Sequence, residues 1–422
     1  MRATLPVRSV APAFGWLLAF VIGCGGGSPD VATSDINLTE SGDASAAPMT
    51  TRDRGHVSST FPAFVPSVPQ LVGQGGPVIV SPEITPISFD ADDASARQAI
   101  ESFVQQVGST DYWSAVTAEY GIGRARGMAP VHVAEPPPAS VSDDDVRAWL
   151  TNRISSAHIA TNANSIFAIF YPSASHVTFK GIEGCKGFGG YHESMSLSGG
   201  ERVSYVVVPR CATFNQLTGM NMVTALASHE LAESATDPEP SGHRGFVELD
   251  RDHFVWQVFD GDENGDLCTS SSGATFTPST MPFVVQRTWS NAAARRGKSP
   301  CQPQGEVYFN SAVVMPDRIS MHALGGGPVV ETAGIRAALH ETKVVEIDLF
   351  SDGPTRGPWQ VSAIDITGSL SLTLDRTSGQ NGEKLYLTIG VNRIDSNLGA
   401  TPFQIVSTLG QTEQRWYGLV GE

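Results

Sequence analysis

The chain has 422 residues, which is enough for two or three domains of ordinary size, and 41% of them are hydrophobic, which is enough to form buried cores. Its 43 acidic residues outnumber 27 basic ones, giving a formal net charge of -16 at pH 7. A nucleic-acid partner requires a basic face, so this composition argues against one.

Residues 1–23 have the pattern of a secretory signal peptide. Two arginines precede an apolar run over residues 11–22, which is too short for a transmembrane helix. The run ends in Val-Ile-Gly-Cys, which resembles the bacterial lipoprotein box, so Cys24 is the predicted lipid anchor. An ordinary signal peptide with a chance cysteine is the alternative. Because Gly25 follows where an aspartate would favour the inner membrane, we expect an exported protein anchored by lipid to the outer membrane or cell surface.

Composition then divides the mature chain into three parts. Residues 24–74 are rich in Gly, Ser, Ala, Pro, Thr and Asp and are predicted to be a flexible tether. Residues 75–304 mix strand and helix patterns, which predicts an α/β or α+β domain. Residues 305–422 contain short β-rich runs separated by turn residues, which predicts an all-β, immunoglobulin-like sandwich of antiparallel strands.

The predicted elements follow from hydrophobic periodicity. In the first domain we expect strands at 76–80, 86–89, 165–171 and 203–208, and helices at 94–107 with Ser95 as a cap, at 143–154 with Ser142 as a cap, and from about 221 to 236. In the sandwich we expect strands at 307–309, 344–350, 360–366, 369–374, 384–391 and 403–406.

Four cysteines follow Cys24, and an even number in an exported chain favours two disulfides. Three pairings are possible. We favour Cys185 with Cys211 and Cys268 with Cys301, because each pair closes a loop of moderate length beside the helix of residues 221–236. A four-cysteine zinc site is the less favoured alternative, since the chain has no CxxC pair.

The last of these helices contains the segment HELAESATDP, residues 229–238. The HExxE spacing places His229 and Glu233 one turn apart, so that both side chains can hold one cation. Glu230 could then act as a general base on a water molecule, as in zinc hydrolases with an HExxH helix. A chance spacing on a solvated helix is the alternative interpretation.

A hydrolytic zinc site needs a third protein ligand, and the acidic loop of residues 260–268 offers several carboxylates. The same loop matches the first half of a calcium-binding loop, with Asp260, Asp262 and Asn264 at the first, third and fifth places. It lacks the closing glutamate, because the twelfth position is Ser271. A zinc ligand, a separate Ca²⁺ site and an acidic surface turn are therefore three open interpretations.

Several motifs together resemble one exported family, the plant EXORDIUM or phosphate-induced proteins and their bacterial relatives. The matching segments are HELAESATDP, GDLC at 265–268, VQRTWSN at 285–291, and upstream pieces at 75–78, 112–113, 120–123 and 187–192. The resemblance covers residues 75–301 and excludes the sandwich. It implies a zincin-like, metalloprotease-type domain in 75–304, but no settled activity.

By position, the resemblance implies His229, Glu233 and Asp266 as metal ligands and Glu230 as the base. It also makes His192 a possible fourth ligand or oxyanion-stabilising donor, although a structural hydrogen-bonding role is the more frequent one for such a histidine. His243 and His253 are alternatives to Asp266 as the third ligand.

These observations predict a lipid-anchored, cell-surface metallohydrolase acting on a peptide or cell-wall substrate. Zn²⁺ is the expected ion, although a glutamate in place of the second histidine makes the ligand set harder and more tolerant of Ca²⁺ or Mn²⁺. The alternative is a catalytically silent binding or adhesion protein in which the metal is structural.

Overall fold

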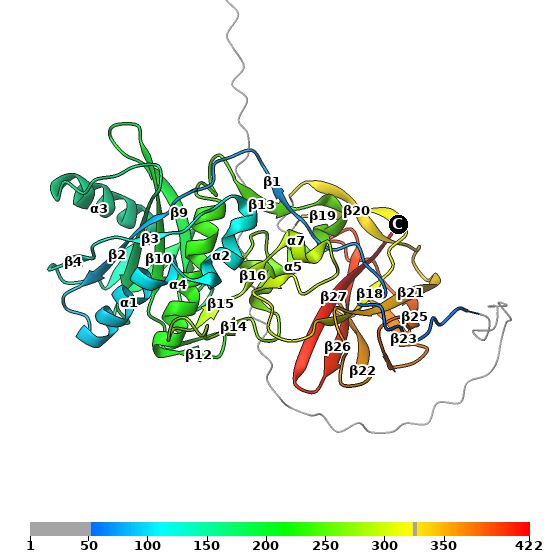
Figure 1. The fold of residues 1–422 in the computed structure, drawn as a ribbon. Coiled ribbons are helices and arrows are strands. Elements are labelled where there is room, and N and C mark those ends of the chain that lie inside the picture. The colour runs from blue at the N-terminus through cyan, green and yellow to red at the C-terminus, as the bar shows by residue number, and fades with distance from the viewer. Residues whose placement is uncertain (1–51, 324–326) are drawn as a thin grey trace, which may run out of the picture.

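The computed structural model describes residues 52–323 and 327–422. The predicted signal peptide, Cys24 and the first part of the predicted tether lie outside these ranges. The described chain forms a mixed α/β domain followed by a β-sandwich, with α5 (Phe254–Asp260) between them (Figure 1).

A mixed six-stranded sheet forms the centre of the first domain. Its order is β3-β2-β6-β10-β9, and β4 also pairs with β2. All pairs are parallel except that of β10 with the edge strand β9. The strands are β2 (Glu83–Phe89), β3 (Arg126–Gly127), β4 (Val131–Val133), β6 (Ser165–Tyr171), β9 (Tyr191–Ser196) and β10 (Arg202–Pro209).

Helices cover both faces of this sheet, because its central strands are apolar on both sides. In β6, Ile166, Ala168 and Phe170 belong to the larger core. The intervening Phe167, Ile169 and Tyr171 belong to a second core, shared with α3 (Asp143–Ser156). The larger core also includes buried residues of α1 (Ala94–Val107), α2 (Asp111–Thr117) and α4 (Gly219–Thr236). Continuous apolar strands of this kind are typical of a sheet enclosed between two layers.

The predicted helices are close to those observed. The α1 range agrees with the prediction, but its cap is Asp93, whose carboxylate accepts the Ala96 N–H, and the prediction of Ser95 is wrong. Ser142 does cap α3, in a capping box with Asp145. The remaining helical segments are the 3-10 turns Ala118–Tyr120 and Arg251–His253, α6 (Asp266–Thr269) and α7 (Asn291–Ala294). Across the described ranges, no helix is long and apolar enough to cross a membrane.

The strand predicted at 76–80 does not form. Residues 78–80 run as irregular chain, with Ile79 buried and its N–H donating to the carbonyl of Ala235 at 2.9 Å. Apolar residues here cover the end of α4 instead of joining a sheet. The short strands around the main sheet are β1 (Leu71–Gly73), β5 (Ser140–Ser142), β7 (His176–Phe179), β8 (Ile182–Glu183), β11 (Thr213–Phe214), β12 (Leu217–Thr218), β13 (Phe246–Leu249), β14 (Thr275–Phe276), β15 (Val285–Gln286), β16 (Thr288–Trp289) and β17 (Cys301–Gln302).

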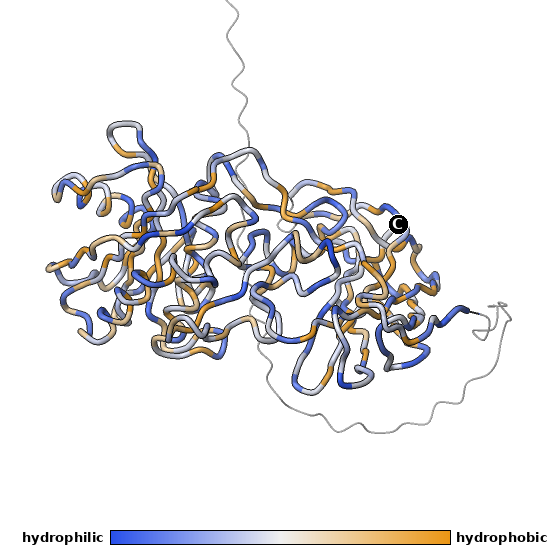
Figure 2. Tube along the Cα trace, viewed as in Figure 1, coloured by the Kyte–Doolittle hydropathy of each residue, from blue (hydrophilic) through white to orange (hydrophobic). Residues whose placement is uncertain are grey.

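The second domain consists of two sheets that share one hydrophobic core, in agreement with the predicted sandwich (Figure 2). One sheet has the order β18-β21-β25-β23 and the other β19-β20-β27-β26-β22-β24. Their strands are β18 (Phe309–Val313), β19 (Asp317–His322), β20 (Val329–Arg336), β21 (Thr342–Ser351), β22 (Trp359–Asp365), β23 (Leu370–Leu374), β24 (Ser378–Gly379), β25 (Lys384–Val391), β26 (Thr401–Leu409) and β27 (Thr412–Gly421).

All six predicted sandwich strands overlap observed strands, but β19, β20, β24 and β27 were not predicted. The pattern of β27 explains the omission, because its first four residues are polar or charged and its last six are buried without alternation. The pair β20 and β27 is parallel, which departs from the predicted antiparallel arrangement.

Residues 52–74 differ from the predicted flexible tether. Gly55 forms a bridge with Glu383, and the side-chain amide of Asn381 donates to the carbonyls of Ser58 and Thr60. Further along, β1 pairs with β13. The segment therefore lies along both domains. Its small polar residues do not form a core, but its backbone groups find partners on the folded surface.

Two disulfides join Cys185 to Cys211 and Cys268 to Cys301, which confirms the favoured pairing. Because all four sulfurs are used in this way, the four-cysteine zinc site is wrong. The first disulfide links the segment before β9 to the segment after β10. The second ties α6 to β17.

The two domains meet at an aromatic cluster. Trp256 of α5 lies 5.4 Å from Trp416 and 5.0 Å from Tyr417 of β27, between ring centroids, in edge-to-face arrangements. Phe259 stacks on Tyr417 at 5.4 Å. Because these rings belong to the core cluster that runs through both domains, we infer that the domains unfold together.

Trp256→Ala should lower the free energy of unfolding by about 3 to 5 kcal/mol, because truncation of a buried aromatic leaves a cavity at the domain junction. Urea denaturation followed by fluorescence and circular dichroism measures this. Ile364→Ala is the control, since Ile364 is 46% exposed on the sandwich and should change stability by about 0.5 kcal/mol or less. Equal effects of the two substitutions would contradict the interface argument.

Candidate metal centre

The helix α4 carries the HELAE segment through the interior of the first domain. All its residues from Met222 to Thr236 are buried. It ends at Asp237, which precedes Pro238, as expected because proline disfavours helix in the residue before it. An ionisable group on this helix therefore needs a partner within the protein.

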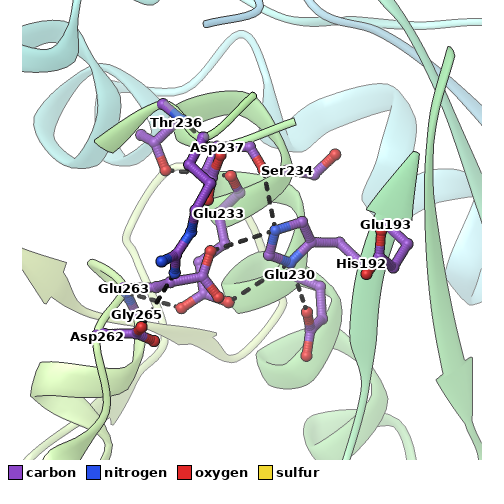
Figure 3. A network of polar contacts seen from close by, with 12 residues as sticks. His192, Glu193, Glu230, Glu233, Ser234, Thr236, Asp237, Asp262, Glu263 and Gly265 are labelled. Carbon is purple, nitrogen blue, oxygen red and sulfur yellow. Dashed lines mark hydrogen bonds and ion pairs between the residues drawn. The ribbon is translucent and has the colours of Figure 1, made fainter. Parts of the chain in front are cut away.

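Three other segments bring polar side chains to the same place. The edge strand β9 supplies His192, and the chain after α5 supplies Asp262 and Glu263 (Figure 3). Asp266 follows in the same chain segment, and β15 supplies Gln286. The side chains of His192, Glu230, Glu233 and Glu263 are each 6% exposed or less.

The predicted ligands His229, Glu233 and Asp266 come together. One side-chain atom from each lies within 4.8 Å of the others. His229 Nε2 is 3.0 Å from Glu233 Oε2 and 3.6 Å from Asp266 Oδ1. His229 and Asp266 keep a little solvent exposure, at 11% and 18% of their side chains, so this group lies at the outer edge of the cluster.

Gln286 orients the imidazole of His229. Its side-chain nitrogen lies 2.9 Å from His229 Nδ1 and donates to the carbonyl of Gly265 at 2.8 Å. A half-turn of the amide would place its oxygen against Nδ1 instead, and would exchange the bond to the Gly265 carbonyl for one from a protonated Nδ1. That orientation is required whenever Nδ1 carries the proton, which includes any state in which Nε2 binds an ion.

The carboxylate of Glu233 is held on its other side by backbone N–H groups. Gly265 and Asp266 each donate to Oε1 at 3.1 Å. Only glycine allows this approach at position 265, because a Cβ there would come within 2.7 Å of both Glu233 Oε1 and His229 Nδ1. Oε2 is thereby directed towards the two histidines.

His192 faces a second pair of carboxylates from α4. Its Nδ1 lies 3.4 Å from Glu230 Oε2 and 3.9 Å from Glu233 Oε2. Its Nε2 lies 3.1 Å from the carbonyl oxygen of Asp237 and 3.3 Å from Glu263 Oε1. The predicted base Glu230 thus contacts His192, and His192, Glu230 and Glu233 also offer atoms within 4.8 Å of one another.

The acidic loop contributes a third group, formed by Asp262, Glu263 and Asp266 within the same distance. Asp262 also pairs with Arg244, whose Nη2 lies 3.1 Å from Oδ2. Asp266 therefore belongs to two of the three groups, as does Glu233.

Both histidines favour their charged forms in the absence of an ion. Burial lowers the pKa of His229, but the neighbouring carboxylates, Glu233 first and then Glu230 and Asp266, together outweigh this and raise it to about 10. Burial likewise lowers the pKa of His192, but Glu263 and Glu230 together raise it well above its usual value. The carboxylates thus attract positive charge to this region.

The pKa values of three carboxyl groups are raised, which favours their neutral forms. Burial raises the pKa of Glu230, against the opposing hydrogen bond from His192. Burial is the main cause that raises the pKa of Asp266 well above its usual value, and the charge of Glu233 is the next. Burial and the charge of Glu263 raise the pKa of Asp262 to about 7.

Among the described residues, carboxyl groups outnumber basic groups in this cluster. Two imidazoles and the Arg244 guanidinium face six carboxyl groups, which belong to Glu230, Glu233, Asp237, Asp262, Glu263 and Asp266. Within the same ranges, buried atoms of Glu263, Asn264 and Asp237 have no hydrogen-bond partner. A cluster of this composition fits a divalent cation, because nitrogen and carboxylate oxygen ligands are what Zn²⁺ and Mn²⁺ use in proteins.

The other predicted candidates lie in different surroundings. Asp260 accepts a hydrogen bond from Tyr417 of the sandwich at 3.0 Å, and in the described chain none of the three groups contains it. His253 pairs with Asp250 at 2.7 Å, and His243 is exposed. A calcium loop centred on Asp260 and Asp262 would therefore require the Asp260 side chain to leave the domain junction.

Four residues of this cluster were not predicted from sequence as site residues, namely Asp237, Arg244, Glu263 and Gln286. Glu263 sits between Asp262 and Asn264, and the calcium-loop pattern drew attention to its neighbours instead. Gln286 lies within the matched VQRTWSN segment, so its presence there was the available signal.

No family model matches the chain, and no curated protein matches it. Among solved structures, it is similar to domains 4 and 5 of the S-layer protein SbsC, with 13% identity over 35% of this chain and 89% of that one and a TM-score of 0.17. Domains 1–6 of SbsC give 11% identity over 58% of this chain and 37% of that one, with a TM-score of 0.16. The common geometry at these scores is too limited to transfer a fold or a function, and the EXORDIUM resemblance stays a prediction.

Asp260 should make stability depend on pH near neutrality. Burial raises its folded pKa to about 7, against the opposing hydrogen bond from Tyr417. Since this exceeds the unfolded value, its contribution to stability is complete below about pH 4 and is lost as pH rises to 7. Thermal melts between pH 4 and 8 should therefore fall less with pH in Asp260→Asn than in the native chain. The exposed control Asp53→Asn should follow the native profile, and parallel profiles for Asp260→Asn would exclude this assignment.

Proposed function

We propose that this protein is an exported metallohydrolase acting on peptide bonds, with its metal centre on the HELAE helix. The observation that carries the proposal is the buried cluster, rich in carboxyl groups, in which ligand atoms of His229, Glu233 and Asp266 lie within 4.8 Å of one another. The ionisable groups of this cluster come from three separate parts of the chain, which are strand β9, helix α4 and the segment of residues 260–268. Such clustering of perturbed titratable groups is typical of functional sites.

His229, Glu233 and Asp266 would hold the ion in this proposal. A bound divalent cation supplies Lewis acidity towards a water molecule and a substrate carbonyl. Glu230 would accept the proton from that water, because its carboxylate adjoins the cluster and burial raises its pKa towards the working range of a general base. Gln286 and the N–H groups of residues 265 and 266 would keep the ligands oriented.

Zn²⁺ is the ion we propose first, with Mn²⁺ or Ca²⁺ as alternatives. A site with one imidazole and two carboxylates is harder than the two-histidine site of an HExxH enzyme. The exclusively acidic group Asp262, Glu263 and Asp266 supports the same reasoning, because it presents only oxygen ligands.

The zincin-like interpretation is supported by the convergence of three matched segments. The segment 187–192 ends in His192, HELAE lies on α4, and GDLC begins with Gly265, whose N–H contacts Glu233. Nothing in their spacing along the sequence requires these segments to meet. If they form one site, we expect them to lie close together, as they do.

The proposed location is the cell surface, with the chain attached through lipid at Cys24. Two disulfides are consistent with an oxidising compartment outside the cytoplasm. The acidic composition disfavours nucleic acid as a partner, so the proposed partners are the membrane and a peptide or cell-wall substrate.

A catalytically silent binding protein with a structural metal is the second candidate. The observation that favours it is the low exposure of the cluster, in which Glu233 is 2% and Glu230 5% exposed. A substrate would reach the ion through the edge at His229 and Asp266, the two more exposed of its proposed ligands. Activity and metal content therefore need separate tests.

Metal analysis tests the site directly. Purified protein should retain stoichiometric Zn²⁺ after gel filtration, and His229→Ala should lose the ion that it shares with Glu233 and Asp266, because a nitrogen ligand is removed. Inductively coupled plasma mass spectrometry measures the content. The matched control is His243→Ala, which changes an exposed histidine and should bind metal as the native chain does. Native protein that binds no Zn²⁺, Mn²⁺ or Ca²⁺ would rule out the proposal.

Glu230→Gln tests the catalytic role. It should lower peptide hydrolysis by about 10²- to 10⁴-fold, because the amide cannot accept a proton. The ion held by His229, Glu233 and Asp266 should stay bound. A broad peptide-library assay with mass-spectrometric detection gives the rate, with Glu306→Gln, which changes an exposed carboxylate, as the control. Equal rates for native protein and Glu230→Gln would eliminate Glu230 as the base, and absence of hydrolysis in metal-loaded native protein would favour the silent binding protein.

A further inference from the structure

His192 has the surroundings of a metal ligand in its own right. It projects from β9 towards α4, and its side chain is 3% exposed (Figure 3). Its Nδ1 faces Glu230 Oε2 at 3.4 Å and Glu233 Oε2 at 3.9 Å. These three side chains come from two elements and leave space for one ion among their ligand atoms, which lie within 4.8 Å of one another.

The hydrogen bonding of the other ring nitrogen favours this role. His192 Nε2 lies 3.1 Å from the carbonyl oxygen of Asp237, so its N–H donates to that carbonyl. In the neutral ring, the lone pair is then on Nδ1 and points to the two carboxylates. Histidines that bind metals usually donate their second N–H to a carbonyl or carboxylate in this way.

Glu263 lies on the other side of the His192 imidazole. Its side chain is 3% exposed, its Oε1 lies 3.3 Å from His192 Nε2, and that oxygen has no hydrogen-bond partner within the described residues. A buried polar atom without a partner is costly. A proton held on Nε2 faces this oxygen and the Asp237 carbonyl, which leaves Nδ1 to face Glu230 and Glu233.

Glu233 connects this position to the one at His229. Its Oε2 is 3.0 Å from His229 Nε2 and 3.9 Å from His192 Nδ1, so one oxygen faces both imidazoles. Its Oε1 is occupied by two backbone N–H donors and is not free to bind a second ion. A carboxylate held in this manner is suited to bridge two cations about 3.5 to 4 Å apart.

We propose that His192, Glu230 and Glu233 form a second cation position, so that the centre holds two divalent ions bridged by Glu233. This inference rests on the proposed function for the first ion, held by His229, Glu233 and Asp266. It also extends the role of Glu230, since one of its oxygens contacts the second ion. Glu230→Gln should therefore lower metal content as well as rate.

The test is the metal stoichiometry of the whole chain, titrated with Zn²⁺ by calorimetry and analysed after gel filtration. Native protein should bind two ions per chain. His192→Gln and Glu230→Gln should each bind one, His229→Gln should bind the other one, and Glu233→Gln should bind neither tightly. Near-ultraviolet circular dichroism controls for folding, and the control Glu306→Gln, at an exposed position, should match the native chain.

The outcomes separate the two proposals. One ion in native protein that His229→Gln abolishes and His192→Gln retains would overturn the second position and leave the first intact. One ion that depends on His192 and not on His229 would overturn the first position. No bound ion would overturn both.

Manganese gives a readout that does not depend on any variant. Two Mn²⁺ ions that share the Glu233 oxygen should give an exchange-coupled electron paramagnetic resonance spectrum at saturation. Isolated-ion spectra at every loading would overturn the bridged arrangement even if two ions bind.

Discussion

The burial of Glu233 is the constraint on which the rest of the centre depends. One of its oxygens accepts two backbone N–H groups from the loop after α5, and the other faces the imidazoles of His229 and His192. A carboxylate in the interior must be neutralised or paired. The surrounding chain pairs this carboxylate on both sides. Imidazoles face one of its oxygens, and backbone N–H groups donate to the other. The same residue consequently fixes the loop, the two histidines and the space between them.

The disulfides hold the segments that surround this carboxylate. Cys268 lies two residues after Asp266 and joins α6 to β17, while Cys185 lies seven residues before His192 and joins the segment after β10. Both bridges therefore limit the motion of chain that carries a candidate ligand. For an acidic cluster this matters, because repulsion between carboxylates would otherwise separate the loop from the helix whenever the compensating charge is absent.

The domain junction connects the same loop to the sandwich. Helix α5 leads directly into the acidic segment, and its Trp256 and Phe259 pack on Tyr417. Asp260, at the end of α5, bonds to the same tyrosine. The sandwich thus supports the loop that carries Asp262, Glu263 and Asp266. This arrangement gives the second domain a structural role at the centre, in addition to any ligand that its other surfaces bind.

The sequence by itself determined the local features of this protein. Periodicity located α1, α3 and α4, β6 and β10, and six strands of the sandwich, because side-chain period and turn residues are properties of neighbouring positions. It also placed His229 and Glu233 on one face of a helix and indicated both disulfide pairs. Only the tertiary structure decided that residues 52–74 lie along both domains, that Asp260 faces Tyr417, and that His192 and Glu263 join Glu233. These contacts join positions up to about three hundred residues apart. A local sequence pattern does not predict which buried charges will meet, because that depends on how the sheet, the helix and the loop pack together.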